Sequence, residues 1–202
     1  MASTEKEGTK RFLTVNPEKC VGCSICEFAC SLEKEGNLNP AKSRIRIIRG
    51  PPFIHLATTC RQCDDTPCIR ACPKEALHQS KETGAILVDD EKCDGCKWCL
   101  EACDYGAITY DKDAKTVRIC DLCDGKPKCK DMCPEEAVDF ACEESEITKA
   151  WVIASKKWID ASKKLVKMSK GEEVTDFLAE SREIMERIDG KYKELFERKK
   201  NE

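Results

Sequence analysis

The residues best suited to do chemistry in this chain are its cysteines. The 202 residues include 17 cysteines, and 16 of them lie between Cys20 and Cys133 in four groups of four. Each group opens with two cysteines separated by two residues and ends with two separated by three. The groups are Cys20, Cys23, Cys26 and Cys30; Cys60, Cys63, Cys68 and Cys72; Cys93, Cys96, Cys99 and Cys103; and Cys120, Cys123, Cys129 and Cys133. Such a repeat predicts four sites of one kind.

The spacing within each group is typical of iron–sulfur chemistry. A cubane [4Fe–4S] cluster needs one thiolate on each of its four irons, and the fourth cysteine of such a run ligates a second cluster in bacterial ferredoxins. Zinc is the main alternative, but zinc sites usually combine separated cysteine pairs, often with histidine. The chain has only two histidines, His55 and His78. The groups therefore favour four [4Fe–4S] clusters, with iron bound through the cysteines, over zinc.

Composition excludes several other classes of protein. The formal net charge is −3, so no basic excess indicates nucleic acid as a partner. No run of 18 apolar residues predicts a membrane span, and the first residues lack the apolar core of an export signal. We therefore expect a cytoplasmic chain, in which structural disulfides are rare. Cys142 has no partner at ligand spacing, and we interpret it as a small buried apolar residue.

Short strands and turns must position the cysteines. Apolar runs predict strands at 11–15, 85–88, 107–110, 115–119 and 137–140, and helical turns fit at 27–29 and 100–102. Residues 31–59 form an insert in which basic and apolar residues alternate from Arg44 to Ile47. This alternation predicts an edge strand with a solvated face, or else a docking strand for a partner subunit.

The composition changes after Cys142. Residues 143–202 contain no cysteine and no proline, and apolar residues recur there at alternating spacings of four and three on either side of Gly171. This pattern predicts two amphipathic helices. Residues 149–170 carry a net charge of +6 and residues 172–189 one of −5, so an antiparallel hairpin would bring opposite charges face to face. Trp151 and Trp158 are large apolar anchors that favour association with another chain.

The order of these motifs resembles the four-cluster polyferredoxin subunits of tungsten aldehyde oxidoreductases, carbon monoxide dehydrogenases and tungsten benzoyl-CoA reductases. The resemblance covers about residues 12–141 and is carried by CVGCSICEFAC, NPAKSRIRI, CRQCDDTPCIRACP, CDGCKWCLEAC and CDLCDGKPKCKDMCP. It implies nested pairing of the first group with the fourth, and of the second with the third. The implied ligand sets are Cys20, Cys23, Cys26 and Cys133; Cys120, Cys123, Cys129 and Cys30; Cys60, Cys63, Cys68 and Cys103; and Cys93, Cys96, Cys99 and Cys72.

The resemblance implies an α+β fold of tandem, pseudo-twofold ferredoxin-like domains over residues 1–142. We expect residues 143–202 to follow as a helical hairpin that serves as an association module. The implied function is single-electron, low-potential transfer between a catalytic oxidoreductase subunit and another redox partner, in an anaerobic and oligomeric complex. Further copies of this chain are possible partners through the helices.

Three alternatives differ in how the chain would be used. It could be a free soluble carrier, although a carrier needs no helical module. It could belong to a hydrogenase or formate dehydrogenase complex, although the short fourth motif argues against the latter. An enzyme in its own right would need a cluster with a missing ligand, a nucleotide-binding G-x-G-x-x-G or a P-loop. The four groups are complete and both motifs are absent, so we expect no catalytic residue.

Overall fold

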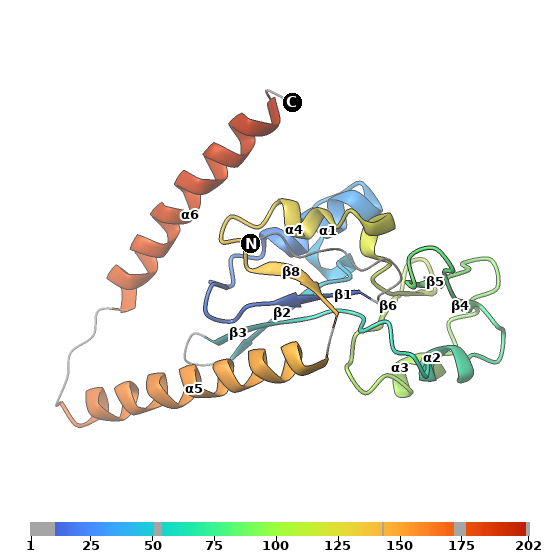
Figure 1. The fold of residues 1–202 in the computed structure, drawn as a ribbon, viewed down its shortest axis with the longest axis horizontal. Helices are drawn as coiled ribbons and strands as arrows, with labels where there is room; N and C mark the ends of the chain where they lie inside the picture. Colours follow the sequence, from blue (N-terminus) through green and yellow to red (C-terminus); the bar gives the residue numbers. More distant parts are fainter. Residues whose placement is uncertain (1–10, 51–53, 143, 172–176, 201–202) are drawn as a thin grey trace.

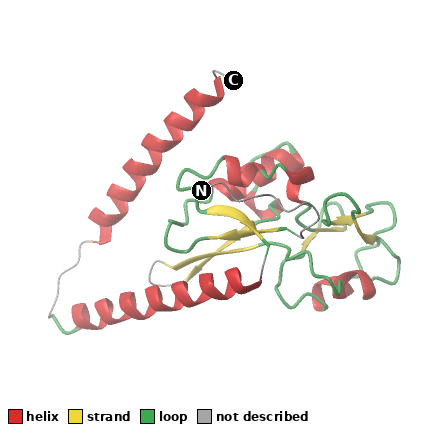
Figure 2. Ribbon diagram, in the orientation of Figure 1, coloured by secondary structure: helices red, strands yellow, loops and turns green. Residues whose placement is uncertain are grey.

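The computed structural model describes residues 11–50, 54–142, 144–171 and 177–200. Short strands and helices make up the cysteine-rich part, and two long helices follow it at the C-terminal end (Figure 1). Figure 2 shows one set of strands near the centre of the molecule and another toward its right-hand side, with long loops between the elements. This mixture of small strands and separate helices is the expected α+β arrangement.

The strands in the described part of the chain form two-stranded antiparallel ladders. β1 (Phe12–Val15) pairs with β8 (Val138–Ala141), which joins the two ends of the cysteine-rich region. The other ladders are hairpins: β2 (Arg46–Gly50) with β3 (Ile54–Thr58), β4 (Leu77–Gln79) with β5 (Ile86–Val88), and β6 (Thr109–Asp111) with β7 (Thr116–Arg118). Isolated two-stranded ladders are marginal in water. Other groups must therefore stabilise this region.

The strands expected from apolar runs are confirmed to within two residues at each end. β3 and β4 are additional. β4 has only three residues, too few to show a period, and β3 follows a Pro-Pro pair that usually indicates a turn. In the insert, the strand expected near Arg44 exists as β2, which buries Ile47 and exposes Ile48, and Ile45 is buried directly before it. Buried Glu27 accepts a hydrogen bond from the Ile47 N–H at 3.0 Å, beside the hairpin.

A short helix holds the third cysteine of every group as its second residue. The helices are α1 (Ile25–Glu35), α2 (Pro67–Arg70), α3 (Trp98–Glu101) and α4 (Lys128–Asp131), and short 3-10 turns lie at Pro40–Lys42 and Leu122–Gly125. α1 is longer than the single turn expected at 27–29. Ser31 follows the last cysteine of its group, where Pro73 and Pro134 follow in two others, so α1 continues to Gly36, whose φ of 69° ends it.

The C-terminal helices are present as expected, but they are arranged differently. α5 (Glu144–Ser169) contacts β3, and α6 (Phe177–Lys200) diverges from α5 rather than lying along it (Figure 1). Across the described parts of the two helices, the expected face-to-face pairing of their opposite charges is therefore not seen. The small residue Ala154 is buried on the inner side of α5, whereas Trp151 and Trp158 are half exposed. A small side chain allows α5 to lie close to the hairpin, and this leaves the large side chains outside.

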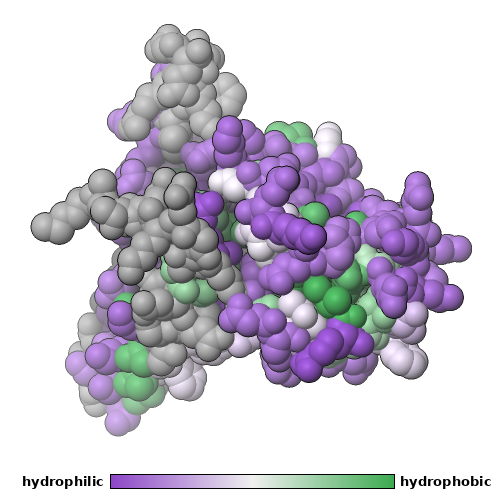
Figure 3. All heavy atoms as spheres, turned by 45° about the vertical axis from the view of Figure 1, so that its right-hand side comes forward, coloured by the Kyte–Doolittle hydropathy of each residue, from purple (hydrophilic) through white to green (hydrophobic). Residues whose placement is uncertain are grey.

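The core of the cysteine-rich part consists of small and β-branched residues together with cysteines. Leu13, Ile45, Ile86 and Val117 are almost completely buried within it. On the face drawn in Figure 3, hydrophilic side chains cover most of the described surface and apolar ones show between them in small groups. None of the described helices combines the length and the apolar character needed to cross a bilayer.

Candidate iron–sulfur sites

Four cavities in the structure are each lined by four of the cysteines. Each set has three cysteines from one group and the last cysteine of another. We name them cavity A, with Cys20, Cys23, Cys26 and Cys133; cavity B, with Cys30, Cys120, Cys123 and Cys129; cavity C, with Cys60, Cys63, Cys68 and Cys103; and cavity D, with Cys72, Cys93, Cys96 and Cys99. The structure thus brings together the same sets that the family resemblance implies.

The same backbone turn recurs beside every cavity. The residue two places after the first cysteine of each group has a left-handed conformation: Gly22 (φ 71°), Gln62 (φ 50°), Gly95 (φ 71°) and Leu122 (φ 61°). Glycine adopts this conformation freely, whereas it costs other residues about 1 kcal/mol or more. The strained Gln62 is held by two buried hydrogen bonds. Its Nε2 donates to the Cys120 carbonyl at 2.8 Å, and its Oε1 accepts from the Ile86 N–H at 2.8 Å.

Backbone N–H groups donate hydrogen bonds to cysteine sulfurs around the cavities. The N–H of Arg44 lies 3.3 Å from Cys30 Sγ, and that of Gln62 lies 3.4 Å from Cys60 Sγ. Cys72 and Cys133 accept similar bonds at 3.3 Å, in each case from the alanine four residues further along the chain. Hydrogen bonds to sulfur stabilise negative charge there and tune the potential of a bound cluster.

The thiols are buried among apolar groups, which disfavours their charged form. Burial raises the pKa of Cys60 to about 12 and the pKa values of Cys68 and Cys99 to about 11. It also raises the pKa values of Cys26 and Cys129 well above the usual range. Four thiolates can share such a cavity only if a cationic group lies between them. Metal ions are groups of this kind, because coordination to a metal deprotonates a thiol outright. The donor set therefore fits an iron–sulfur core.

Electrostatic contacts between cysteines give the order of the cavities. Burial raises the pKa of Cys129 in cavity B, and Cys26 in cavity A adds to the effect. Cys60 in cavity C acts in the same way on Cys120 in cavity B. Cys68 in cavity C acts on Cys99 in cavity D. Such contacts require proximity, so the cavities follow one another as A, B, C and D.

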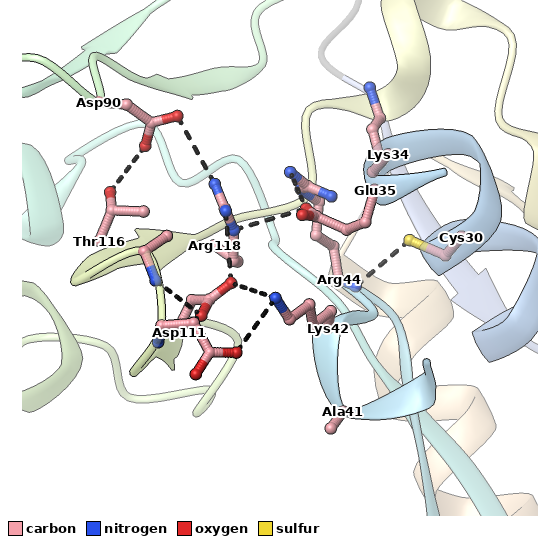
Figure 4. Close-up of polar contacts among 12 residues, drawn as sticks. Cys30, Lys34, Glu35, Ala41, Lys42, Arg44, Asp90, Asp111, Thr116 and Arg118 are labelled. Atoms are coloured by element: carbon pink, nitrogen blue, oxygen red, sulfur yellow. Dashed lines mark hydrogen bonds and ion pairs between the residues drawn. The ribbon is translucent and has the colours of Figure 1, made fainter. Parts of the chain in front are cut away.

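A network of ion pairs connects the two halves of the cavity row (Figure 4). Arg118 on β7 lies 3.5 Å from Glu35 on α1, 3.4 Å from Asp111 and 3.6 Å from Asp90. Glu35 also pairs at 3.2 Å with Arg44, whose N–H donates to Cys30. Neither Gln62 nor Arg118 was singled out from the sequence, because most of the partners of each lie more than 20 residues away in the chain.

The structure also bears on the expectations for Cys142 and for sites that bind a single metal ion. Cys142 is exposed rather than buried, because it follows β8 at the point where the chain leaves the ladder for α5. Within the described ranges, no group of three or more His, Cys, Asp or Glu side chains could hold a single metal ion. The cysteines of each set surround a cavity instead.

Comparison with known proteins also indicates iron–sulfur binding. The 4Fe-4S dicluster domain family matches residues 53–143. The polyferredoxin-like subunit of the aliphatic sulfonate oxidoreductase of Pyrococcus furiosus is 42% identical over 136 residues, covering 67% of this chain and 79% of that subunit. This chain belongs to the same polyferredoxin family. The polyferredoxin is also 35% identical over 153 residues to electron transport protein HydN of Escherichia coli, covering 63% of this chain and 86% of that one.

Among solved structures, the polyferredoxin is similar to the BamBC active-site complex of benzoyl-CoA reductase with benzoyl-CoA. The identity is 21%, the TM-score is 0.37, and the match covers 78% of this chain and 96% of that one. The relatives named above are an electron transport protein and a subunit of an oxidoreductase. The polyferredoxin is accordingly an iron–sulfur electron-transfer subunit.

Proposed function

We propose that the polyferredoxin binds four [4Fe–4S] clusters, one in each of cavities A to D, through the four cysteines that line it. The observation that carries this proposal is the lining itself, because each cavity has one thiol for each iron of a cubane. The N–H donors at the sulfurs and the need for a cationic core support it. An arrangement for four separate zinc ions would need donors that converge on single points.

Metal analysis of anaerobically purified protein tests this proposal. We expect about 16 iron and 16 acid-labile sulfide per chain, the count for four cubanes. About eight iron, or stoichiometric zinc, would contradict it. Exposure to air should lower both counts, since cysteines released from a damaged cluster oxidise readily.

The function we infer is relay of single electrons between a catalytic oxidoreductase subunit and a second redox partner. A cluster with four thiolate ligands supplies one-electron chemistry and has no open iron for a substrate. The row from cavity A to cavity D provides a continuous series of such sites. At one end, Cys96 of cavity D is exposed beside Trp98, so a partner can approach this site closely. The buried cysteines of cavity B occupy the interior of the row.

We further propose an aldehyde oxidoreductase-like or carbon monoxide dehydrogenase-like subunit as the catalytic partner. The relative from Pyrococcus furiosus, a subunit of an aliphatic sulfonate oxidoreductase, supports an oxidoreductase complex of this general kind. Anaerobic affinity purification of the polyferredoxin from its own cells tests the idea. A co-purifying subunit that contains tungsten or a nickel–iron centre is expected, and recovery of the polyferredoxin alone would contradict it.

A second proposal concerns the long helices, which we infer to associate with other copies of the chain. Six of the 13 exposed large hydrophobic residues in the described ranges lie on α5 in two rows at heptad spacing. These are Trp151, Trp158 and Leu165 in one row and Val152, Ile159 and Val166 in the other. Neighbouring heptad rows of this type pack against partner helices.

Truncation after Cys142 separates association from the alternative that the helices shield the clusters. Association predicts that the clusters remain intact while light scattering shows a smaller species. Loss of clusters at an unchanged oligomeric state would remove the assembly role. The double variant Trp151→Ser, Trp158→Ser should also reduce the assembly while leaving the iron content unchanged.

A further inference from the structure

Positive charges from the C-terminal helices converge on cavity A. Among the described residues, Glu135 is the one charged residue that lines this cavity, and 10% of its side chain is exposed. Arg187 Nε on α6 lies 3.3 Å from its Oε1, and Lys191 Nζ lies 3.5 Å from its Oε2. These two cations are four residues apart and so share one face of α6. The neighbouring Ile188 is buried.

α5 contributes a cation to the same place. Lys157 Nζ donates a hydrogen bond of 3.0 Å to the Pro17 carbonyl, in the loop that leads into Cys20. Burial raises the pKa of Cys20, and the Lys157 ammonium opposes this rise. Burial likewise raises the pKa of Cys23, and Glu135 increases the rise. Lys157 on α5 and Glu135 therefore act directly on the sulfurs of cavity A, whereas Arg187 and Lys191 on α6 act through their ion pairs with Glu135.

Cavity A differs from the other three in the origin of its cations. Lys34 and Arg44 line cavity B, Arg61 lines cavity C, and Lys74 and Lys97 line cavity D. The lining of cavity A includes Glu135 but no lysine or arginine. Its neighbouring cations are those of the C-terminal helices and Arg49 on β2, which donates to the Gly22 carbonyl at 3.3 Å and to Ser24 Oγ at the cavity lining.

We propose that the docked helices set the reduction potential of the cluster in cavity A, through Arg187 and Lys191 on Glu135 and through Lys157 beside Cys20. The proposal rests on the proposed presence of a cluster there. One-electron reduction makes the cluster and its thiolates more negative by one charge. Nearby cations stabilise this reduced form, and an unpaired Glu135 destabilises it. Docked α6 thus keeps the potential high, and displacement of α6 makes it more negative.

This arrangement links the position of α6 to electron flow. A partner or second copy that draws α6 away leaves Glu135 unpaired at cavity A, at one end of the row. Reduction of that site then becomes harder, while the sites lined by their own lysines and arginines keep their charges. Assembly therefore changes the reduction potential of the cluster in cavity A, because it changes the position of the charges on α6.

Redox titration of the full-length holoprotein, followed by EPR, tests the proposal. The double variant Arg187→Gln, Lys191→Gln should shift one of the resolved transitions to a more negative potential. Glu135→Gln should shift the same transition to a more positive potential. Arg187→Lys, Lys191→Arg keeps both charges and should restore the wild-type value. Lys193→Gln is the matched control, because this exposed lysine lies on α6 about 200° around the helix from Lys191 and should move nothing.

The possible outcomes separate this inference from the proposed function. Shifts of opposite sign in a single transition support it, since a merely structural role would not reverse sign between the two variants. No shift, equal shifts in every transition, or shifts of the same sign in a protein with the full iron content would overturn the electrostatic role alone. Wild-type protein without iron in cavity A would overturn the proposed function and this inference together.

Discussion

Cys30 is the residue whose position is least obvious from its own motif. It follows Cys26 by four residues on α1, yet it lines cavity B with Cys120, Cys123 and Cys129. A helix places residues four apart on one face but about 6 Å along its axis. This separation lets Cys26 and Cys30 face different cavities, as the crossed ligation of bacterial ferredoxins requires.

We predict that Cys30→Ala damages the cluster of cavity B and leaves that of cavity A with its full ligand set. Iron should fall from about 16 to between about 12 and 15 per chain, depending on whether the cluster is lost or keeps three irons. EPR of the reduced variant, with each signal assigned beforehand, checks which cluster changes. Cys142→Ala, at an exposed cysteine outside the four groups, is the control and should retain all the iron. Damage to the signal of cavity A would show that the crossed assignment is incorrect.

We predict that Gln62→Leu strongly destabilises the fold. Leucine fills much of the space but leaves the Cys120 carbonyl and the Ile86 N–H without their buried partner. Each unsatisfied buried group costs about 1–3 kcal/mol, so the free energy of unfolding should fall by about 2–4 kcal/mol. Thermal unfolding under argon measures the loss. Gln79→Leu, whose exposed side chain bonds to the Gly84 carbonyl at 2.9 Å, should change little by comparison.

At the scale of elements, the turns that carry the cysteines depend on backbone conformation as much as on ligand spacing. Gly95 has a φ of 71°, and a Cβ there would lie 2.6 Å from the Lys115 carbonyl oxygen. Gly84 has a φ of 70°, but a Cβ there would meet no atom within 4 Å. A substitution at Gly84 therefore introduces backbone strain alone, whereas one at Gly95 introduces strain together with steric overlap.

We expect Gly84→Ala to lower stability by about 1 kcal/mol, the cost of a left-handed alanine. Gly95→Ala should lower it by about 2 kcal/mol or more, because β7 must also move away from the turn. The extra movement displaces Cys93 and Cys96, so iron content should fall in Gly95→Ala alone. Equal melting temperatures for the two variants, with full iron in both, would contradict this explanation.

The sequence was most informative about elements that contain their own pattern. Regular cysteine spacing predicts the short helices, and runs such as residues 137–140 predict strands, because these signals depend on neighbours along the chain. The partner of a strand is not local: nothing in residues 11–15 indicates pairing with β8. The same limit applies to α5 and α6. Their heptads predict helices, whereas their divergence depends on the contact of Ala154 with the cysteine-rich part and of α6 with Glu135.

The sites show the same division between local and long-range information. Spacing indicates iron–sulfur chemistry, and family resemblance supplies the crossed cysteine sets. The order of the cavities and the cations around them could not be predicted, since Cys60 and Cys120 approach each other only in the folded chain. Buried Gln62 carried no signal at all, because an isolated glutamine has no characteristic pattern in a sequence.

At the scale of the whole molecule, Arg118 is the main electrostatic connection between the halves. Its guanidinium contacts Glu35 on one side and Asp90 and Asp111 on the other, and 13% of its side chain is exposed. Side chains of such length and charge are costly to bury without partners, whereas here three carboxylates surround one cation.

We predict that Arg118→Met lowers the free energy of unfolding by about 3 kcal/mol, because Glu35 and Asp111, which are nearly buried, each lose one of their cations. The value lies at the lower end for a buried pair, since Arg44 still pairs with Glu35 at 3.2 Å and Lys42 with Asp111 at 3.4 Å. Arg70→Met is the control: its pair with Asp65 is exposed, and its loss should cost less than about 1 kcal/mol. Thermal unfolding under argon compares the two, and similar midpoints would show that Arg118 does not hold the halves together.

The crossing of cysteines between groups also determines when each site can be completed during synthesis. Ribosomes release the chain from its N-terminus. The cysteines that line cavities C and D all lie between Cys60 and Cys103, whereas cavities A and B need residues as late as Cys133 and Cys129. Cys20, Cys23 and Cys26 are synthesised first, but their ligand set is complete only after Cys133, the last of the sixteen, has been added. Cavity A contains the first cysteines of the chain but is the last cavity to be completed. A chain that stops before Cys133 cannot complete it.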